Sequence, residues 1–253
     1  MLIWNLLENT AKQYPDRTAL IAGDKTISYA LLAEKVGKLA AGLVNTGLCP
    51  GDRLAVSLPN SIESVTVILA ANLARLIVVP LLRFYAPAQN AYILSDSQPK
   101  ALVISPAFVE RIPADAFRGI PTVIAIDGPI AGALDYENLI NGISVESPTP
   151  FGDGSDPISI LAYTSGTTGY PKGTIHTQKR LVNRAELFVK TMSLTSDDAI
   201  IANYPIGKPV MLVSGLLAMF RVGGSVALMK QLTSVGFFIL PSWQPHKLPG
   251  MHC

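Results

Sequence analysis

The chain has 253 residues, of which 49% are hydrophobic, and its mean hydropathy is +0.36. These values exclude wholesale disorder and allow one large or two modest domains. The net charge is +2, and the charges are scattered along the chain, which excludes a basic nucleic-acid-binding face and an acidic tail.

The cysteines, the first residues and the apolar stretches bear on metal binding, cellular location and membrane insertion. Cys49 and Cys253 form neither a disulfide framework nor a zinc motif, so we expect no metal site and a cytoplasmic location. The first residues lack the basic start of a signal peptide. The apolar stretches 62–82 and 210–229 are interrupted by polar and charged residues, which favours buried core over an integral membrane span.

The first fifty residues predict two helices and a hairpin. Apolar spacing predicts a helix that ends near residue 14, and two short strands follow at 18–22 and 26–29. An amphipathic helix is then predicted over 30–46, with Gly47 as its C-cap.

From residue 53 the pattern alternates between strands and helices. The predicted elements are a strand at 53–58, a helix at 61–73, a strand at 76–80, a helix at 88–95, a strand at 101–104, a helix within 106–117, a strand at 122–126 and a helix at 136–141. The strands are almost entirely apolar, which is typical of a parallel sheet covered on both faces. The predicted fold class is therefore α/β.

A segment rich in Pro, Gly, Ser and Asp at 144–157 predicts a linker between subdomains. It separates an N-terminal α/β subdomain, 1–143, from the start of a second one, 158–231. The elements expected there are a strand at 158–163, a helix at 176–193, a strand at 198–204, a helix at 211–220 and a strand at 225–229. The tail 232–253 contains spaced prolines and is expected to be irregular.

The most informative segment is 163–173, which reads Tyr-Thr-Ser-Gly-Thr-Thr-Gly-Tyr-Pro-Lys-Gly. Glycines let backbone N–H groups turn toward an anion, hydroxyls add short donors, and a lysine adds positive charge. The spacing fits neither the Gly-x-x-x-x-Gly-Lys-Ser/Thr loop nor the Gly-x-Gly-x-x-Gly dinucleotide fingerprint. The composition predicts a loop that binds a nucleoside triphosphate, with a polar surface turn as the alternative.

This segment resembles the phosphate-binding signature Tyr-Thr-Ser-Gly-Thr-Thr-Gly-x-Pro-Lys-Gly of the adenylate-forming superfamily. That superfamily includes acyl-CoA synthetases, peptide-synthetase adenylation domains and luciferases. Weaker likenesses to fatty-acyl and aryl-CoA ligases at 50–61, 78–81 and 91–97 extend the resemblance over 1–230. It implies the layered α/β/α N-terminal domain of the adenylate-forming fold, truncated, with two incomplete subdomains.

The resemblance implies a ligase of fatty acid metabolism that activates a fatty or aryl carboxylic acid with ATP to an acyl-adenylate, and then forms acyl-CoA. ATP, Mg²⁺ and CoA are the implied cofactors and co-substrates. The chemistry requires charge to be drawn from the β- and γ-phosphates while pyrophosphate leaves. The candidate catalytic residue is Lys172, which is one of the implied phosphate ligands as well. The implied phosphate ligands are Thr164, Ser165, Gly166, Thr167, Thr168, Gly169 and Lys172.

Family members border the acyl pocket with an aromatic residue or a histidine in a Pro-Leu-Phe-His-like turn. The corresponding turn of this chain has no histidine, and Lys208 lies near the expected position. Ordinary core packing is the alternative for the candidate residues. The candidate pocket residues are Tyr204, Met211, Leu212 and Val213.

The resemblance is expected to stop after Gln231. We expect no counterpart in these 253 residues of the family segments that bind adenine and ribose, nor of the C-terminal domain with the adenylation lysine. We therefore expect the N-terminal part of an acid–thiol ligase. The alternative is a truncated, inactive remnant that binds polyphosphate weakly or serves as an interaction module. A membrane-attached protein is a third alternative. The sequence identifies neither the acyl substrate nor the oligomeric state.

Overall fold

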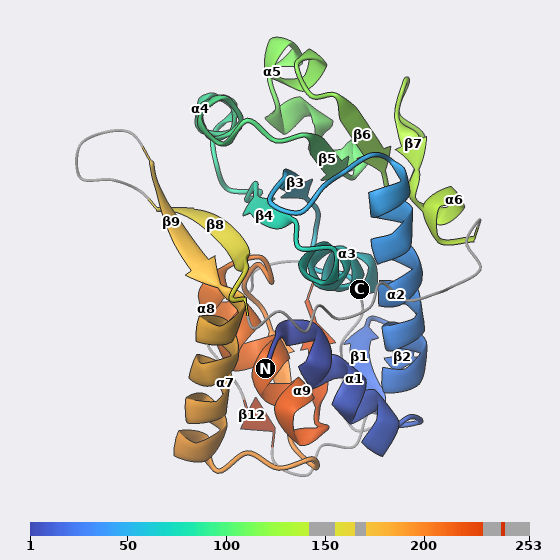
Figure 1. The fold of residues 1–253 in the computed structure, drawn as a ribbon, viewed down its shortest axis with the longest axis vertical. Helices are drawn as coiled ribbons and strands as arrows, with labels where there is room; N and C mark the ends of the chain where they lie inside the picture. Colours follow the sequence, from blue (N-terminus) through green and yellow to red (C-terminus); the bar gives the residue numbers. More distant parts are fainter. Residues whose placement is uncertain (142–154, 165–170, 230–238, 241–253) are drawn as a thin grey trace. The chain divides into compact units, whose positions relative to one another are not determined.

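The computed structural model describes residues 1–141, 155–164, 171–229 and 239–240. The chain forms two compact units, and each is described by itself (Figure 1). Unit 1 consists of Met1–Glu34, Asn60–Val65 and Lys179–Cys253, and unit 2 of Lys35–Pro59 and Thr66–Gln178. The predicted linker, 144–157, lies mostly outside the described residues, so the predicted domain boundaries stay a prediction.

Unit 2 contains a sheet whose described strands run in the order β7-β6-β5-β3-β4-β8-β9. Neighbouring strands are parallel, except for the antiparallel pair β8 and β9. The inner strands β3 to β5 are almost entirely buried, and this confirms the predicted parallel sheet with two covered faces. The strands are β3 Arg53–Ser57, β4 Ile77–Pro80, β5 Ala101–Ile104, β6 Thr122–Ala125, β7 Leu134–Asp135, β8 Ile158–Thr164 and β9 Lys172–Thr177.

The helices of unit 2 form where the sequence supplies periodic apolar residues and end signals. Helix α2 ends before Gly47, whose φ of 90° confirms the predicted C-cap. Helix α4 begins with Pro87, and the Gln89 side chain accepts a hydrogen bond from the Ala86 N–H at 2.9 Å. The helices are most of α2 Tyr29–Asn45 and of α3 Ile62–Leu73, then α4 Pro87–Ser97, the 3-10 helix η1 Pro106–Arg111, α5 Ala114–Arg118 and α6 Tyr136–Asn141.

Unit 1 contains a second sheet, whose described strands run in the order β12-β10-β11-β1-β2. Strands β10, β11 and β1 are parallel, and the edge strands β12 and β2 pair antiparallel to their neighbours. The pairing of β1 with β11 places Leu20 beside Val226, a contact between distant segments that the sequence did not predict. The strands are β1 Thr18–Ala22, β2 Lys25–Ser28, β10 Ala199–Ala202, β11 Ser225–Leu228 and β12 Ile239–Leu240.

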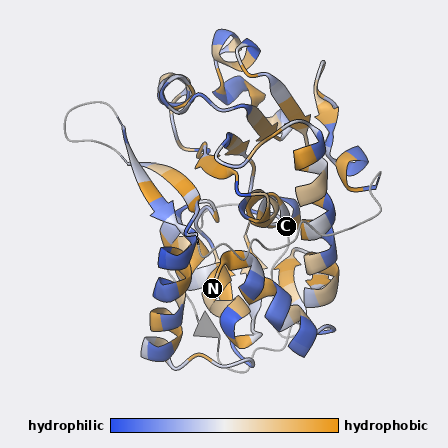
Figure 2. Cartoon of the chain, in the orientation of Figure 1, coloured by the Kyte–Doolittle hydropathy of each residue, from blue (hydrophilic) through white to orange (hydrophobic). Residues whose placement is uncertain are grey.

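The helices of unit 1 differ in burial, from one buried face in α7 to complete burial in η2. Helix α7 buries Leu181, Val182 and Ala185, and Figure 2 shows hydrophilic and hydrophobic residues alternating along it. The prediction that this helix begins at 176 was wrong, because residues 172–177 form β9. The helices are α1 Ile3–Gln13, α7 Gln178–Met192, α8 Pro209–Met211, the π-helix η2 Leu212–Leu217 and α9 Ala218–Val222. Every helix in the described part of the chain is too short or too polar to span a membrane.

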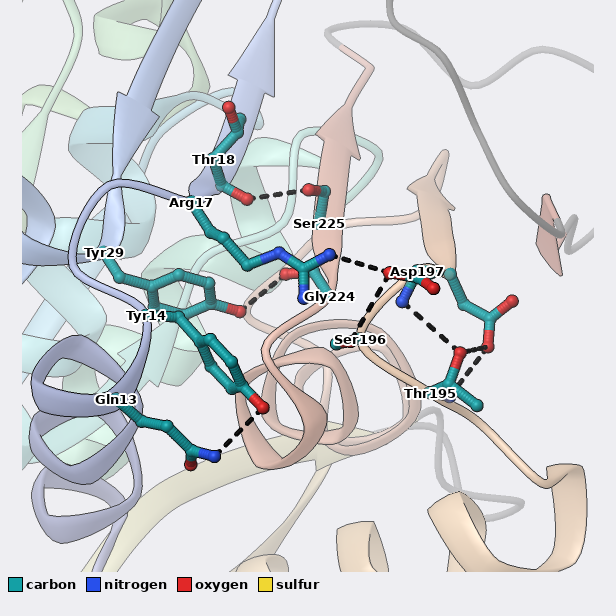
Figure 3. Close-up of polar contacts among 11 residues, drawn as sticks. Gln13, Tyr14, Arg17, Thr18, Tyr29, Thr195, Ser196, Asp197, Gly224 and Ser225 are labelled. Carbon is teal, nitrogen blue, oxygen red and sulfur yellow. Dashed lines mark hydrogen bonds and ion pairs between the residues drawn. The ribbon is translucent and has the colours of Figure 1, made fainter.

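Polar contacts join the N-terminal segment of unit 1 to its later strands (Figure 3). The Ser225 hydroxyl donates to the Thr18 carbonyl at 2.7 Å, which supplements the ladder between β1 and β11. Arg17 donates from Nη2 to Oδ1 of Asp197 at 2.8 Å, in the turn before β10. These side chains reinforce the long-range strand order of the sheet.

Candidate functional site

The hairpin of β8 and β9 carries both ends of the predicted phosphate loop. Its register pairs Ala162 with Thr174, Tyr163 with Gly173, and Thr164 with Lys172. Thr164 and Lys172 are exposed, and they form the final pair before the loop. The structure therefore brings two of the predicted phosphate ligands to opposite positions on adjacent strands, where a hydroxyl and an ammonium group could contact one anion.

The other predicted phosphate ligands are Ser165, Gly166, Thr167, Thr168 and Gly169. They lie outside the described residues, so their roles stay predictions.

Tyr163 anchors the end of β8. Its side chain is 2% exposed, and its hydroxyl donates to Oδ2 of Asp96 in α4 at 2.5 Å. Its backbone carbonyl accepts a hydrogen bond from the Tyr85 hydroxyl at 2.8 Å. Burial, and then the hydrogen bond to Asp96, raise the pKa of the Tyr163 phenol, so the side chain stays a neutral donor. The sequence motif did not reveal this hydrogen bond, because Tyr163 and Asp96 are 67 residues apart and meet only in the folded chain.

Gly173 has a packing role in this hairpin. A Cβ at this position would lie 2.9 Å from Cδ1 of Leu161 and 3.5 Å from Cζ of Tyr163. A side chain at position 173 would therefore require the Leu161 methyl to move aside, and it would touch the Tyr163 ring at ordinary contact distance. Gly173 is the last residue of the 163–173 motif, and the structure places it within β9.

The predicted acyl-pocket residues lie in unit 1. Met211 and Leu212 are fully buried and Val213 is 6% exposed, at the end of α8 and the start of η2. Tyr204 is partly buried in the turn after β10. Such burial suits a pocket wall and core packing equally, so the pocket role stays a prediction.

The turn that carries Tyr204 is held by the buried side chain of Asn60. Its Nδ2 donates to the carbonyls of Ala202 at 3.1 Å and Tyr204 at 2.9 Å, and its Oδ1 accepts from the Ile206 N–H at 2.9 Å. One amide thus satisfies three backbone groups of the turn. Sequence reasoning missed this role, because the three partners of Asn60 lie more than 140 residues away in the sequence.

The segment after this turn contains a π-helix in place of the uninterrupted helix that the sequence predicted. A Cβ on Gly215 would lie 2.6 Å from Sδ of Met211, so the thioether packs directly on the glycine. The Ser214 hydroxyl donates to the Val210 carbonyl at 2.6 Å. Such π-turns are frequent at functional sites, which keeps η2 among the candidates. Burial lowers the pKa of the nearby Lys208 amine.

The residue chemistry fits a phosphate ligand better than a protein-bound metal. Within the described ranges, the acidic, histidine and cysteine side chains form no group of three or more that could hold a metal ion. Mg²⁺ typically binds few carboxylates and takes further oxygens from substrate phosphates. The hairpin supplies instead a cation and hydroxyl, Lys172 and Thr164, that suit the phosphates themselves.

Residues 7–243 match the family of AMP-binding enzymes. The chain belongs to this family. The match confirms the resemblance seen in the loop and continues to residue 243, so the expectation that it stops after Gln231 was wrong.

Relatives in the AMP-binding family include two CoA ligases. The chain is 32% identical over 231 residues to an oxalate–CoA ligase of Arabidopsis thaliana, covering 88% of this chain and 44% of that protein. It is 32% identical over 217 residues to the mitochondrial medium-chain acyl-CoA ligase ACSF2 of Homo sapiens, covering 74% of this chain and 35% of that protein. The chain therefore spans less than half the length of both relatives.

A solved structure confirms the fold. The apo structure of MbtA from Mycobacterium smegmatis matches with a TM-score of 0.82 and 26% identity, over 91% of this chain and 44% of that one. The predicted fold class, the α/β N-terminal domain of adenylate-forming enzymes, is thereby confirmed for this AMP-binding chain.

Proposed function

We propose that the chain supplies the ATP-phosphate-binding part of an acid–CoA ligase. The observation that carries this proposal is the β8–β9 register, in which Thr164 lies opposite Lys172 at the two ends of the family's phosphate signature. Relatives named as CoA ligases support it. The comparisons lend no support to the alternative of an inactive remnant.

In the proposed reaction, a carboxylate oxygen bonds to the α-phosphorus of ATP as the bond from that phosphorus to the bridging oxygen breaks and pyrophosphate leaves. The Lys172 ammonium would donate hydrogen bonds to oxygens of the departing β- and γ-phosphates, and the Thr164 hydroxyl would donate another. Both groups stabilise charge that grows on pyrophosphate. The CoA thiol then loses its proton to solvent and its sulfur bonds to the acyl carbon, as the bond from that carbon to the phosphate oxygen breaks and AMP leaves.

Mg²⁺ held by the phosphates would neutralise further negative charge during this step. The remaining proposed phosphate ligands are the loop hydroxyls and amides of residues 165–169. Their short donors suit anionic oxygens, as the family signature implies.

The proposed substrate class is a fatty or aryl carboxylic acid, and a cytoplasmic location is kept as part of the proposal. In the proposed pocket, the apolar side chains of Met211, Leu212 and Val213 would favour an apolar acyl group, because burial of hydrocarbon stabilises binding by the hydrophobic effect. The two relatives are named for different acids, oxalate and a medium-chain acyl group, so their names do not select one substrate. The proposed choice of a fatty or aryl acid therefore rests on the candidate pocket residues.

The test is isothermal titration of the full chain with Mg–ATP and with pyrophosphate, followed by pyrophosphate exchange with a panel of fatty and aryl acids. We expect Lys172→Ala to weaken phosphate binding by about tenfold or more, the loss of one charged hydrogen-bond donor. Lys100→Ala is the matched control, because Lys100 is an exposed lysine of the same unit away from the hairpin. Equal affinities in the wild type and Lys172→Ala would contradict the proposal.

A further inference from the structure

Tyr163 and Asp96 are joined by a hydrogen bond at the base of the β8–β9 hairpin, and we infer that this pair positions Thr164 and Lys172 for phosphate binding. The inference rests on the proposed function and assigns positioning roles to two residues outside the phosphate-contacting set. It follows from three observations within unit 2: where the backbone ladder ends, what surrounds the Tyr163 ring, and what holds its backbone.

The first observation concerns the strand ladder beneath the hairpin. Strand β4 pairs with β8 at Val78 and Ile160, three residues before Tyr163, and β4 ends at Pro80. Proline has no N–H to donate, so it cannot extend a ladder along the end of β8. Figure 1 shows the loop end of the hairpin extending away from β4. Beyond β4, the end of β8 is paired, among the described strands, with β9 alone, so side-chain contacts are what join this end of the hairpin to the rest of unit 2.

The second observation is the confinement of the Tyr163 ring. The ring lies against β9 at Gly173, where a Cβ would approach Cζ to 3.5 Å. Its hydroxyl donates to Asp96 Oδ2 at 2.5 Å, which ties it to helix α4. A hydrogen bond to an ionised carboxylate is stronger than one between neutral groups. The ring is thus held both by strand packing and by a charge-assisted hydrogen bond at its tip.

The third observation is the backbone anchor. The Tyr85 hydroxyl donates to the Tyr163 carbonyl at 2.8 Å, and the Tyr85 ring packs edge-on against Phe84 with centroids 5.3 Å apart. Tyr163 is therefore fixed through its side chain by Asp96 and through its backbone by Tyr85. Thr164 follows Tyr163 directly, and Lys172 directly precedes Gly173. A shift of the Tyr163 ring would move both phosphate ligands.

Positioning affects affinity because groups already held in their binding geometry need no ordering when the ligand arrives. We expect Tyr163→Phe, which removes only the hydroxyl, to raise the Kd for Mg–ATP and for inorganic pyrophosphate by about five- to tenfold. Asp96→Asn keeps an acceptor but removes the charge, so its Kd should lie between those of the wild type and Tyr163→Phe.

The experiment compares these variants in the full chain by calorimetric titration and by urea unfolding. Tyr29→Phe is the matched control, because Tyr29 is a fully buried tyrosine of unit 1 whose hydroxyl also makes a hydrogen bond. It should destabilise the chain and leave the pyrophosphate Kd unchanged. A Lys172→Ala background supplies a second control, in which the effect of Tyr163→Phe on Kd should shrink, since the positioned ammonium is absent.

The outcomes separate the two proposals. If Lys172→Ala binds pyrophosphate as tightly as the wild type, the proposed function fails. If Lys172→Ala weakens binding but Tyr163→Phe changes Kd no more than Tyr29→Phe does, the positioning role is overturned and the proposed function stands. Should Tyr163→Phe not fold, Asp96→Asn and Tyr85→Phe carry the same test, and unchanged Kd values in both would overturn the inference.

Discussion

The Tyr29 hydroxyl donates a 2.6 Å hydrogen bond to the carbonyl of Gly224, across 195 positions of sequence. The Tyr29 side chain is fully buried and meets the Phe220 ring edge-on, with centroids 5.5 Å apart. This contact fastens the first residue of α2 to the segment that leads into β11. It stabilises the side of unit 1 on which distant parts of the chain form one sheet.

Tyr29→Phe should lower the free energy of unfolding by about 1–2 kcal/mol, because it leaves the buried Gly224 carbonyl without this donor. Urea unfolding followed by circular dichroism measures the change. Tyr14→Phe is the control, since the Tyr14 hydroxyl accepts its hydrogen bond from Gln13 at an exposed position. Equal midpoints for Tyr29→Phe and the wild type would show that another donor replaces the lost hydroxyl.

Gly42→Ala should destabilise unit 2, although alanine favours helices. The new Cβ would lie 2.5 Å from the backbone oxygen of Leu139, so α2 or α6 must shift. We expect a net loss of about 1–3 kcal/mol, measured by thermal and urea unfolding. Gly119→Ala is the control, because a Cβ there meets only ordinary contacts at 3.7 Å. Comparable stability of the two variants would contradict the crowding at position 42.

Asp197→Ala should have only a small effect. Arg17 and Asp197 form an ion pair of 2.8 Å, but their side chains are 40% and 74% exposed. Exposed pairs typically contribute about 0–1 kcal/mol, and salt screens them. A double-mutant cycle with Arg17→Ala, at low and high salt, measures the coupling. A large coupling that is insensitive to salt would mean that the pair is shielded from solvent.

Alkaline pH should destabilise the chain through its buried tyrosines. Burial raises the pKa of Tyr29 and of Tyr163 above the ordinary value of 10.0. Above pH 10.0 the unfolded chain loses these protons before the folded chain does. Below pH 10.0 these two groups therefore give the free energy of unfolding no pH dependence. Above pH 10.0 the free energy of unfolding falls as the pH rises.

Unfolding midpoints measured on either side of pH 10.0 test this dependence. Tyr29→Phe and Tyr163→Phe should each reduce the alkaline loss of stability. Tyrosinate absorbance of the wild type should show these two phenols ionising together with unfolding. An alkaline slope that neither variant changes would assign the transition to other groups.

The sequence by itself determined the features that depend on local order along the chain. Apolar strands and periodic helices from residue 53 to 141 predicted the parallel sheet of unit 2, since burial on both faces demands continuous apolar runs. The glycine, hydroxyl and lysine spacing of 163–173 predicted the family. Thr164 and Lys172 could be proposed as phosphate ligands for the same reason, because the motif that contains them is contiguous in the sequence.

Only the tertiary structure decided features made by residues far apart. Strand β9 is largely exposed and lacks alternating apolar residues, so its strand form comes from pairing with β8. Three further features likewise join distant segments. They are the pairing of β1 with β11, the hydrogen bonds of Asn60 to the turn at Tyr204, and the hydrogen bond of Tyr163 to Asp96. A donor's residue type is visible in the sequence, but its acceptor is set by packing of the whole chain, which brings the two within hydrogen-bonding distance.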